Sequence, residues 1–247
     1  MKISFSTLGC PEFGWRDIYS LAKDFGFDGI EVRGLGNKRF TGPGQPLSEE
    51  QWPHTKQKLE ELRLEISCLS SGCCLKFAEK AEDNHKELVR YITLAGKLGT
   101  PYVRILGDNE PQPTGAVDDQ VVLAALRRLI PIAEANQVTL LVETSGVYAD
   151  TKRLGQLLNQ IASDAIGALW DIHHPYRFAG ETPEQTVQNL GAYIKYAHVK
   201  DSVVLDDAIQ YRMLGEGDLP IAQIMSALNS IKYAGYLSLE WVKAWAP

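Results

Sequence analysis

The sequence predicts an α/β protein whose eight β-strands alternate with helices and close into a (β/α)8 barrel. Short apolar runs typical of buried strands alternate with amphipathic runs of helical period along all 247 residues. Strict alternation indicates a parallel sheet, and eight repeats indicate a closed barrel rather than an open sheet. No change of composition and no low-complexity linker interrupts the pattern. We therefore expect a single domain over residues 1–247.

The eight predicted strands are short apolar runs bounded by turn residues, as expected for buried parallel strands. They are placed at Lys2–Ser6, Ile30–Arg33, Ile66–Leu69, Tyr102–Leu106, Thr139–Glu143, Ile166–Asp171, Ala197–Lys200 and Tyr236–Glu240. Several of these runs end in a charged residue. A strand buried on both faces should not end in a charge unless that charge meets water, a partner or a metal.

The seven predicted helices are amphipathic runs with recognisable end signals. They are placed at Trp15–Phe25, Ser48–Leu62, Glu82–Leu98, Asp118–Asn136, Asp150–Ala162, Thr182–Lys195 and Pro220–Ile231. The first helix is expected to have one apolar face, formed by Ile18, Leu21, Ala22 and Phe25. The segment Ser48-Glu-Glu-Gln51 is a capping box, and Thr182 precedes a proline at the first helical position.

Three connections are expected to be loops: Gly34–Pro46, Ser70–Cys74 and Asp201–Asp218. The sequence extends only seven residues past Glu240, so we expect the final covering helix of the barrel to be missing. The seam between the last and first strands would then be covered by Trp241 and Trp245 or by a second subunit. A homo-oligomer is one of these two alternatives.

Composition excludes several classes of function. The net charge of −6 argues against a nucleic-acid partner, because phosphate binding needs a basic surface. The four cysteines match neither a metal-binding spacing nor a secreted disulfide framework: Cys10, Cys68, Cys73 and Cys74. We find no signal peptide and no run of about twenty apolar residues. We therefore expect a reduced, cytoplasmic protein without a membrane partner.

Four polar residues end, or stand near the end of, the last four predicted strands: Glu143, Asp171, His198 and Glu240. The carboxyl ends of barrel strands form the active-site face, so these side chains should converge there. Each alone would more simply be a polar residue bonded to a loop. Three carboxylates and one imidazole together predict one divalent metal ion, with Mn²⁺ first and Mg²⁺, Co²⁺ or Zn²⁺ as alternatives.

Other polar residues surround this predicted centre. In Asp171-Ile-His-His174, one histidine can face the site while the other packs, and we choose His174. Arg104 lies inside a strand and needs a carboxylate partner, with Glu31 or Glu143 as candidates. Glu31 either reaches the site or forms a structural ion pair. Lys200 meets either a substrate oxygen or only the neighbouring aspartate.

The chain resembles the sugar phosphate isomerase/epimerase superfamily, whose fold is the xylose isomerase-like barrel. The resemblance spans essentially the whole chain and is carried by Asp28-Gly-Ile-Glu31-Val-Arg33, Leu141-Val-Glu143, Trp170-Asp171-Ile-His-His174, His198-Val-Lys-Asp201, Leu214-Gly-Glu-Gly-Asp218 and Leu239-Glu240. It implies that the four predicted ligands hold the metal and that Glu143 and Glu240 also form the acid/base pair. It further implies that His174 and an arginine matching Arg212 bind substrate oxygens. The endonuclease branch fits poorly, because its additional zinc-binding histidines are missing.

The expected activity is isomerisation or epimerisation of a sugar or keto-polyol by proton transfer next to a carbonyl. A divalent metal stabilises the enediolate formed in such a reaction, and a carboxylate on each side moves the proton. Glu31, Arg104, Lys200, His174 and Arg212 are the candidate substrate-binding residues. The alternative is a lyase or dehydratase that uses the same metal site on a keto-sugar or keto-polyol. A non-catalytic or partner-dependent barrel is a third hypothesis.

Overall fold

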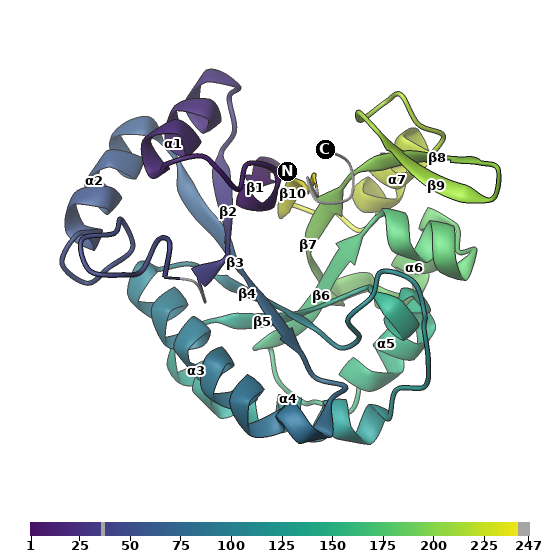
Figure 1. The fold of residues 1–247 in the computed structure, drawn as a ribbon. Helices are drawn as coiled ribbons and strands as arrows, with labels where there is room; N and C mark the ends of the chain where they lie inside the picture. Colours follow the sequence, from purple (N-terminus) through teal and green to yellow (C-terminus); the bar gives the residue numbers. More distant parts are fainter. Residues whose placement is uncertain (36–37, 242–247) are drawn as a thin grey trace.

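The computed structural model describes residues 1–35 and 38–241 and contains a closed barrel of eight parallel strands (Figure 1). Around the barrel the strands follow the order β1-β10-β7-β6-β5-β4-β3-β2, so the first and last strands pair and close it. The strands are β1 (Lys2–Ser6), β2 (Gly29–Arg33), β3 (Glu65–Cys74), β4 (Tyr102–Leu106), β5 (Thr139–Glu143), β6 (Ile166–Asp171), β7 (Ile194–Val199) and β10 (Tyr236–Leu239). The predicted (β/α)8 fold is confirmed.

Seven α-helices lie outside the barrel in the described ranges (Figure 1). They are α1 (Trp15–Asp24), α2 (Trp52–Leu62), α3 (Ala81–Leu98), α4 (Asp119–Ala135), α5 (Thr151–Leu158), α6 (Pro183–Leu190) and α7 (Ile221–Ser230). Short helical turns complete the connections: η1 (Thr7–Gly9), η3 (Ala78–Lys80), η4 (Gly146–Ala149), η6 (Gly191–Tyr193) and the π-helix η5 (Pro175–Ala179). Among residues 1–35 and 38–241, no helix combines the length and the apolarity needed to cross a membrane.

The hydrophobic core has two parts. The larger part lies between the strands and the surrounding helices, where Ile18 and Ala22 of α1 are fully buried. The smaller part fills the barrel interior with side chains from five strands: Cys68, Leu141, Leu169, Tyr196 and Tyr236. The hydroxyl of Tyr196 bonds to the hydroxyls of Ser4 and Ser67, so this interior plug is also polar and well satisfied. Packed side chains therefore fill the barrel interior beneath the carboxyl ends of the strands.

Several helix boundaries differ from the prediction. Helix α5 ends at Leu158 rather than Ala162, and helix α6 ends at Leu190 rather than Lys195. Helix α2 begins at Trp52, four residues later than expected, and Ser48 instead accepts a hydrogen bond from the amide of Gln51 in the preceding turn. Helix α1 ends before Phe25, which is 75% exposed and does not join the apolar face. At Ser48 the predicted helix start is a turn, because a turn can use the same side-chain hydrogen bond as a helix start.

Two predicted loops contain strands. The loop placed at Ser70–Cys74 belongs to β3, whose register against β4 shifts between these residues, so an irregular strand replaces the loop. The long loop Asp201–Asp218 begins with an antiparallel hairpin of β8 (Asp201–Leu205) and β9 (Ala208–Arg212). Its two-residue turn places Asp206 and Asp207 at φ of 50° and 60°, as a type I′ hairpin turn requires.

The seam between β10 and β1 has no covering helix up to Trp241, the last described residue. The backbone of Trp241 lies against Gly9, where an added Cβ would stand 3.3 Å from the Trp241 carbonyl oxygen. Trp241 thus lies against η1 near the seam, and its covering of the seam stays a prediction. Trp245 lies outside the described residues, and a covering subunit stays a prediction.

Candidate metal centre and active site

Four side chains meet at the carboxyl edge of the barrel: Glu143 of β5, Asp171 of β6, His198 of β7 and Glu240 directly after β10. Each offers one ligand atom, and these four atoms lie within 4.8 Å of one another. The strand register explains the convergence, since Asp171 pairs with His198 and Ser238 of β10 also pairs with His198. All four residues are buried. The structure therefore brings together the complete set that the strand ends predicted, and their role as ligands stays a prediction.

The Nδ1 atom of His198 is the clearest sign that the cluster fits a cation. This buried nitrogen has no hydrogen-bond partner among the residues that the structure describes. Three carboxylate oxygens surround it instead, at 3.4 Å from Glu240, 3.8 Å from Glu143 and 3.9 Å from Asp171. A buried polar atom without a partner is costly, and one nitrogen with three oxygens is a donor set that divalent cations accept.

Glu31 lies behind His198 and orients its ring. The Nε2 atom of His198 lies 3.0 and 3.1 Å from the two Glu31 oxygens, while Ser238 donates to the same carboxylate at 2.7 Å and Ser70 donates to it as well. A proton on Nε2 that is held by a carboxylate leaves the Nδ1 lone pair for a metal. We expected Glu31 either to reach the site or to form a structural ion pair. In the structure its oxygens contact His198 and two serines, and its role in substrate binding stays a prediction.

Arg104 finds the carboxylate that its burial requires. Its Nε donates to Glu143, and its Nη1 donates to the carbonyl of Ser71 at 2.9 Å. Burial alone would raise the pKa of Glu143, but Arg104, together with His198 and His174, holds that pKa well below its ordinary value. Of the two partners considered for Arg104, the structure selects Glu143, and it keeps this carboxylate ionised.

Lys200 lies between two of the predicted ligands. Its Nζ is 2.6 Å from Asp171 Oδ2 and also contacts Glu240. Burial opposes ionisation of Glu240, yet His198 and Lys200 lower its pKa to about 2. Asp201, the alternative partner, instead accepts hydrogen bonds from the amides of the loop that follows the hairpin. The lysine therefore belongs to the charged cluster.

The two adjacent histidines separate as expected. His174 Nδ1 contacts the carbonyl of Thr144 at 3.1 Å, while its Nε2 is buried without a hydrogen bond in the described part of the chain and lies 3.5 Å from Asp171 Oδ2. His173 packs against the hairpin: its Nε2 lies 3.0 Å from Ser202 Oγ, and its ring stacks on Tyr211. His174 is thus placed beside the ligands and His173 supports the hairpin. His173 and His174 also form a second group with Asp171 that could hold an ion.

Arg212 is not at the centre of the cluster. Its guanidinium donates to the carbonyl of Tyr211 and to the side chain of Gln210, and it borders a largely apolar cavity of about 500 Å³ that also reaches Lys200. Its neighbour Tyr211 instead faces the cluster, with its ring stacked on His173. Burial raises its pKa, and the charges of Lys200 and Asp171 act on its hydroxyl. The sequence analysis missed Tyr211, although side chains alternate between the two faces of a strand and only one of two neighbours can face the site.

The family model described as "Xylose isomerase-like TIM barrel" matches residues 19–246. The chain belongs to this family. An uncharacterized protein from Methanocaldococcus jannaschii is 28% identical over 124 residues, which are 47% of this chain and 41% of that protein. The chain thus matches less than half the length of this curated relative.

Solved structures share this xylose isomerase-like fold at low sequence identity. D-psicose 3-epimerase from Clostridium cellulolyticum H10 is 16% identical with a TM-score of 0.78, over 97% of this chain and 84% of that chain. The IolI protein, solved with a zinc atom, is 19% identical with a TM-score of 0.78, over 98% and 89%. The probable 3-DHS dehydratase AsbF from Bacillus anthracis is 20% identical with a TM-score of 0.75, over 98% and 93%.

Proposed function

We propose that this xylose isomerase-like barrel is a divalent-metal-dependent isomerase or epimerase of a keto sugar or keto-polyol. The observation that carries the proposal is the buried Nδ1 of His198, which has no hydrogen-bond partner in the described part of the chain and is surrounded by three carboxylates. Glu143, Asp171, His198 and Glu240 would hold the ion. When bound, a divalent cation supplies electrophilic stabilisation for negative charge that develops on a substrate carbonyl. The epimerase and the zinc-containing IolI protein share the fold and agree with the proposal.

Proton transfer is assigned to Glu143 and Glu240. Glu143 is kept ionised by Arg104 and takes the proton from the carbon next to the carbonyl, which leaves an enediolate. Glu240 comes from the other side of the cluster and contacts the ammonium of Lys200, so a proton source stands on that side. Return of a proton to the opposite face of the same carbon inverts it. Return to the neighbouring carbon exchanges ketose and aldose.

Substrate oxygens are assigned to the buried polar groups beside the cluster. His174 presents its Nε2 without a hydrogen-bond partner in the described residues, and a sugar hydroxyl would satisfy it. Tyr211 closes the same side from the hairpin, where His173 holds its ring. Arg212 lies farther along β9 and would reach only the outer end of a substrate.

Elimination is the second candidate reaction. The enediolate that gives epimerisation can instead expel a hydroxyl from the next carbon, and Lys200 is an acid that can protonate that leaving group. The structure of a probable dehydratase with the same fold agrees with this alternative. The two reactions use the same residues and differ in the position of the leaving group on the substrate.

Deuterium incorporation tests the proposal. Protein loaded with Mn²⁺ and incubated with a panel of ketoses in heavy water should place deuterium on the carbon next to the carbonyl, as measured by NMR. Chelator-treated protein should not. Glu143→Gln and Glu240→Gln keep the side-chain shape and should slow exchange by about a hundred- to ten-thousand-fold, the usual cost of losing a positioned acid or base.

The matched control is Glu82→Gln, which changes a surface glutamate that pairs with Arg128 and should exchange like the parent. Release of an unsaturated ketone that absorbs in the ultraviolet would select the elimination reaction. Full activity in Glu240→Gln would remove this residue from proton transfer and leave it as a ligand only.

A further inference from the structure

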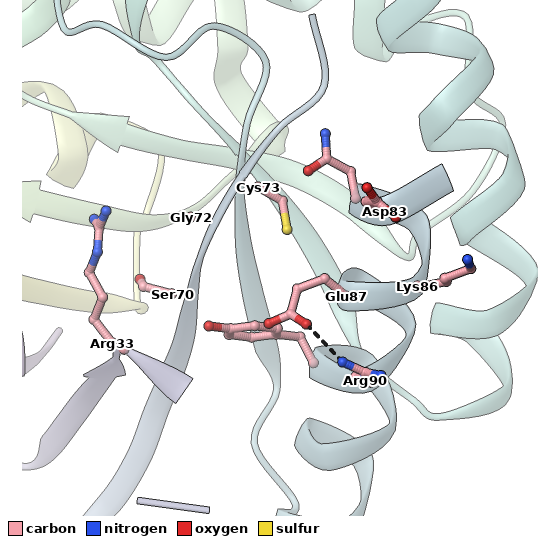
Figure 2. A pocket seen from close by; sticks show the side chains of 11 residues that line it. Arg33, Ser70, Gly72, Cys73, Asp83, Lys86, Glu87 and Arg90 are labelled. Carbon is pink, nitrogen blue, oxygen red and sulfur yellow. Dashed lines mark hydrogen bonds and ion pairs between the residues drawn. The ribbon is translucent and has the colours of Figure 1, made fainter. Parts of the chain in front are cut away.

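A cavity of about 640 Å³ opens beside the predicted metal centre, between the ends of β2 and β3 and the first turns of α3 (Figure 2). Figure 2 shows Arg33 and Ser70 on one side of this cavity and the α3 residues Asp83, Lys86 and Arg90 on the other. Ligand pockets for small molecules typically measure about 300–1,000 Å³, so the cavity is large enough for part of a substrate.

Ser70 connects the cavity to the predicted metal centre. It lines the cavity and also donates to Glu31, the carboxylate that orients His198. The charges of Glu31 and of two predicted ligands, Glu143 and Glu240, act on Arg33 as well. At the inner end of the cavity, Ser70 is therefore connected through Glu31 to His198, one of the predicted metal ligands.

Arg33 lies at this inner end with its guanidinium unsatisfied. The side chain is partly buried, yet in residues 1–35 and 38–241 it makes no hydrogen bond or ion pair that would use its donors. Burial and the nearby charge of Arg104 lower the pKa of Arg33. A desolvated guanidinium with several free donors is unfavourable unless an anion binds it. Arg104, by contrast, is satisfied by Glu143.

The rest of the cavity does not supply that anion. On α3, Glu87 pairs with Arg90 at 3.4 Å, and the other two charged residues, Asp83 and Lys86, have opposite signs, so the outer wall carries as much positive as negative charge. Arg33 is the remaining charged residue of the lining, and it is positive. The N-terminal turn of α3 borders the cavity as well and adds a positive partial charge.

We propose that Arg33 binds an anionic group, a carboxylate or a phosphate, at the end of the substrate remote from the reacting carbon. The inference rests on the proposed function and narrows its substrate class to acidic keto sugars or keto-polyols. A guanidinium matches either group with two parallel hydrogen bonds, which gives orientation as well as affinity. The acidic end would occupy the cavity beside α3 while the carbonyl end reaches Glu143 and Glu240.

Binding of three matched probes tests the inference: ribitol, ribonate and ribitol 5-phosphate, measured by calorimetry with and without Mn²⁺. The parent protein should bind at least one charged probe about ten- to hundred-fold more tightly than ribitol, as expected for a charge-assisted contact. Arg33→Gln should remove this preference and leave ribitol binding unchanged, and Arg33→Lys should keep part of it. Arg128→Gln removes a surface arginine from α4 and should bind all three probes like the parent.

The charged probe whose affinity exceeds that of ribitol by more identifies the anionic group: ribonate indicates a carboxylate, and ribitol 5-phosphate indicates a phosphate. Equal affinity for all three probes, or an equal loss for all three in Arg33→Gln, would overturn the inference. The preference is a ratio of two binding affinities, so it can be measured without enzymatic turnover. Its persistence in metal-free protein would support the Arg33 site even if the proposed metal chemistry failed. Deuterium exchange without any preference would support the chemistry and reject the site.

Discussion

At the residue scale, the site is a set of buried charges, each held by a named partner. Glu31 holds His198, Arg104 holds Glu143, and Lys200 joins Asp171 to Glu240. Without such partners, the burial of these groups would cost several kcal/mol for each ion. The same contacts also settle which atom of each side chain faces the centre, so the partners determine geometry as well as charge.

Replacement of Glu31 should weaken metal binding although Glu31 is not a predicted ligand. Glu31→Gln keeps a hydrogen-bond acceptor for His198 but removes the negative charge that raises the basicity of the ring. We expect Mn²⁺ affinity to fall about ten- to a hundred-fold, as for other residues that support metal ligands. Calorimetric Mn²⁺ titration measures this. Glu82→Gln should bind like the parent, and unchanged affinity in Glu31→Gln would make Glu31 a structural residue only.

At the element scale, Arg177 and His173 connect the β8–β9 hairpin to the loop that follows β6. Arg177 of η5 donates to the hydroxyl of Ser202 at 3.0 Å and to its carbonyl at 2.7 Å, and it pairs with Asp218. The hairpin carries Tyr211 beside the predicted site. The ring of His173 stacks on the ring of Tyr211, and His173 also bonds to Ser202 of the hairpin. The orientation of Tyr211 thus depends on contacts made by the next connection of the barrel.

Arg177→Met should loosen the hairpin while the barrel stays folded. Loss of Arg177 removes one of two donors to the Ser202 carbonyl, which keeps the amide of Asp218, and a lost hydrogen bond typically costs about 0.5–1.5 kcal/mol. We expect faster amide hydrogen exchange at residues 201–218, measured by mass spectrometry, with unchanged Mn²⁺ content. Arg127→Met removes one exposed contact on α4 and serves as the control. Exchange at parent rates in Arg177→Met would show that the remaining contacts, including the hydrogen bond between His173 and Ser202, hold the hairpin without Arg177.

At the scale of the whole molecule, the predicted ligands come from four strands that form one continuous half of the barrel, β5, β6, β7 and β10. An ion held by all four would cross-link this half next to the seam between β10 and β1, where no helix covers the strands in the described residues. A ligand that binds only the folded state stabilises it by mass action. Metal content should therefore affect global stability.

Mn²⁺ at a hundred times its dissociation constant should stabilise the fold by about 2.7 kcal/mol. For a chain of this size, that corresponds to a rise in Tm of about 5–10 °C over chelator-treated protein. Asp171→Asn should lose the rise, whereas Asp24→Asn on the exposed end of α1 should keep it. Differential scanning calorimetry provides the measurement. A full rise in Asp171→Asn would contradict the assignment of this aspartate to the site.

The sequence by itself determined the barrel and the convergence of Glu143, Asp171, His198 and Glu240, because both follow from local patterns. Alternation of strands and helices fixes the direction of every strand, and a residue at the end of a parallel strand must lie at the carboxyl edge. Neither inference requires knowledge of which strands are neighbours. The same holds for Arg104, whose burial demanded a carboxylate before any partner was known.

Only the tertiary structure decided what each side chain contacts. Glu31 and His198 are 167 positions apart in sequence, and their contact depends on closure of the barrel between β1 and β10. Tyr211 rather than Arg212 faces the centre because the hairpin register sets which face of β9 points inward. In residues 1–35 and 38–241 the side chain of Arg33 makes no hydrogen bond or ion pair, whereas Arg104 donates to Glu143. Such contacts depend on register and on distant neighbours, and a local pattern of residues contains neither.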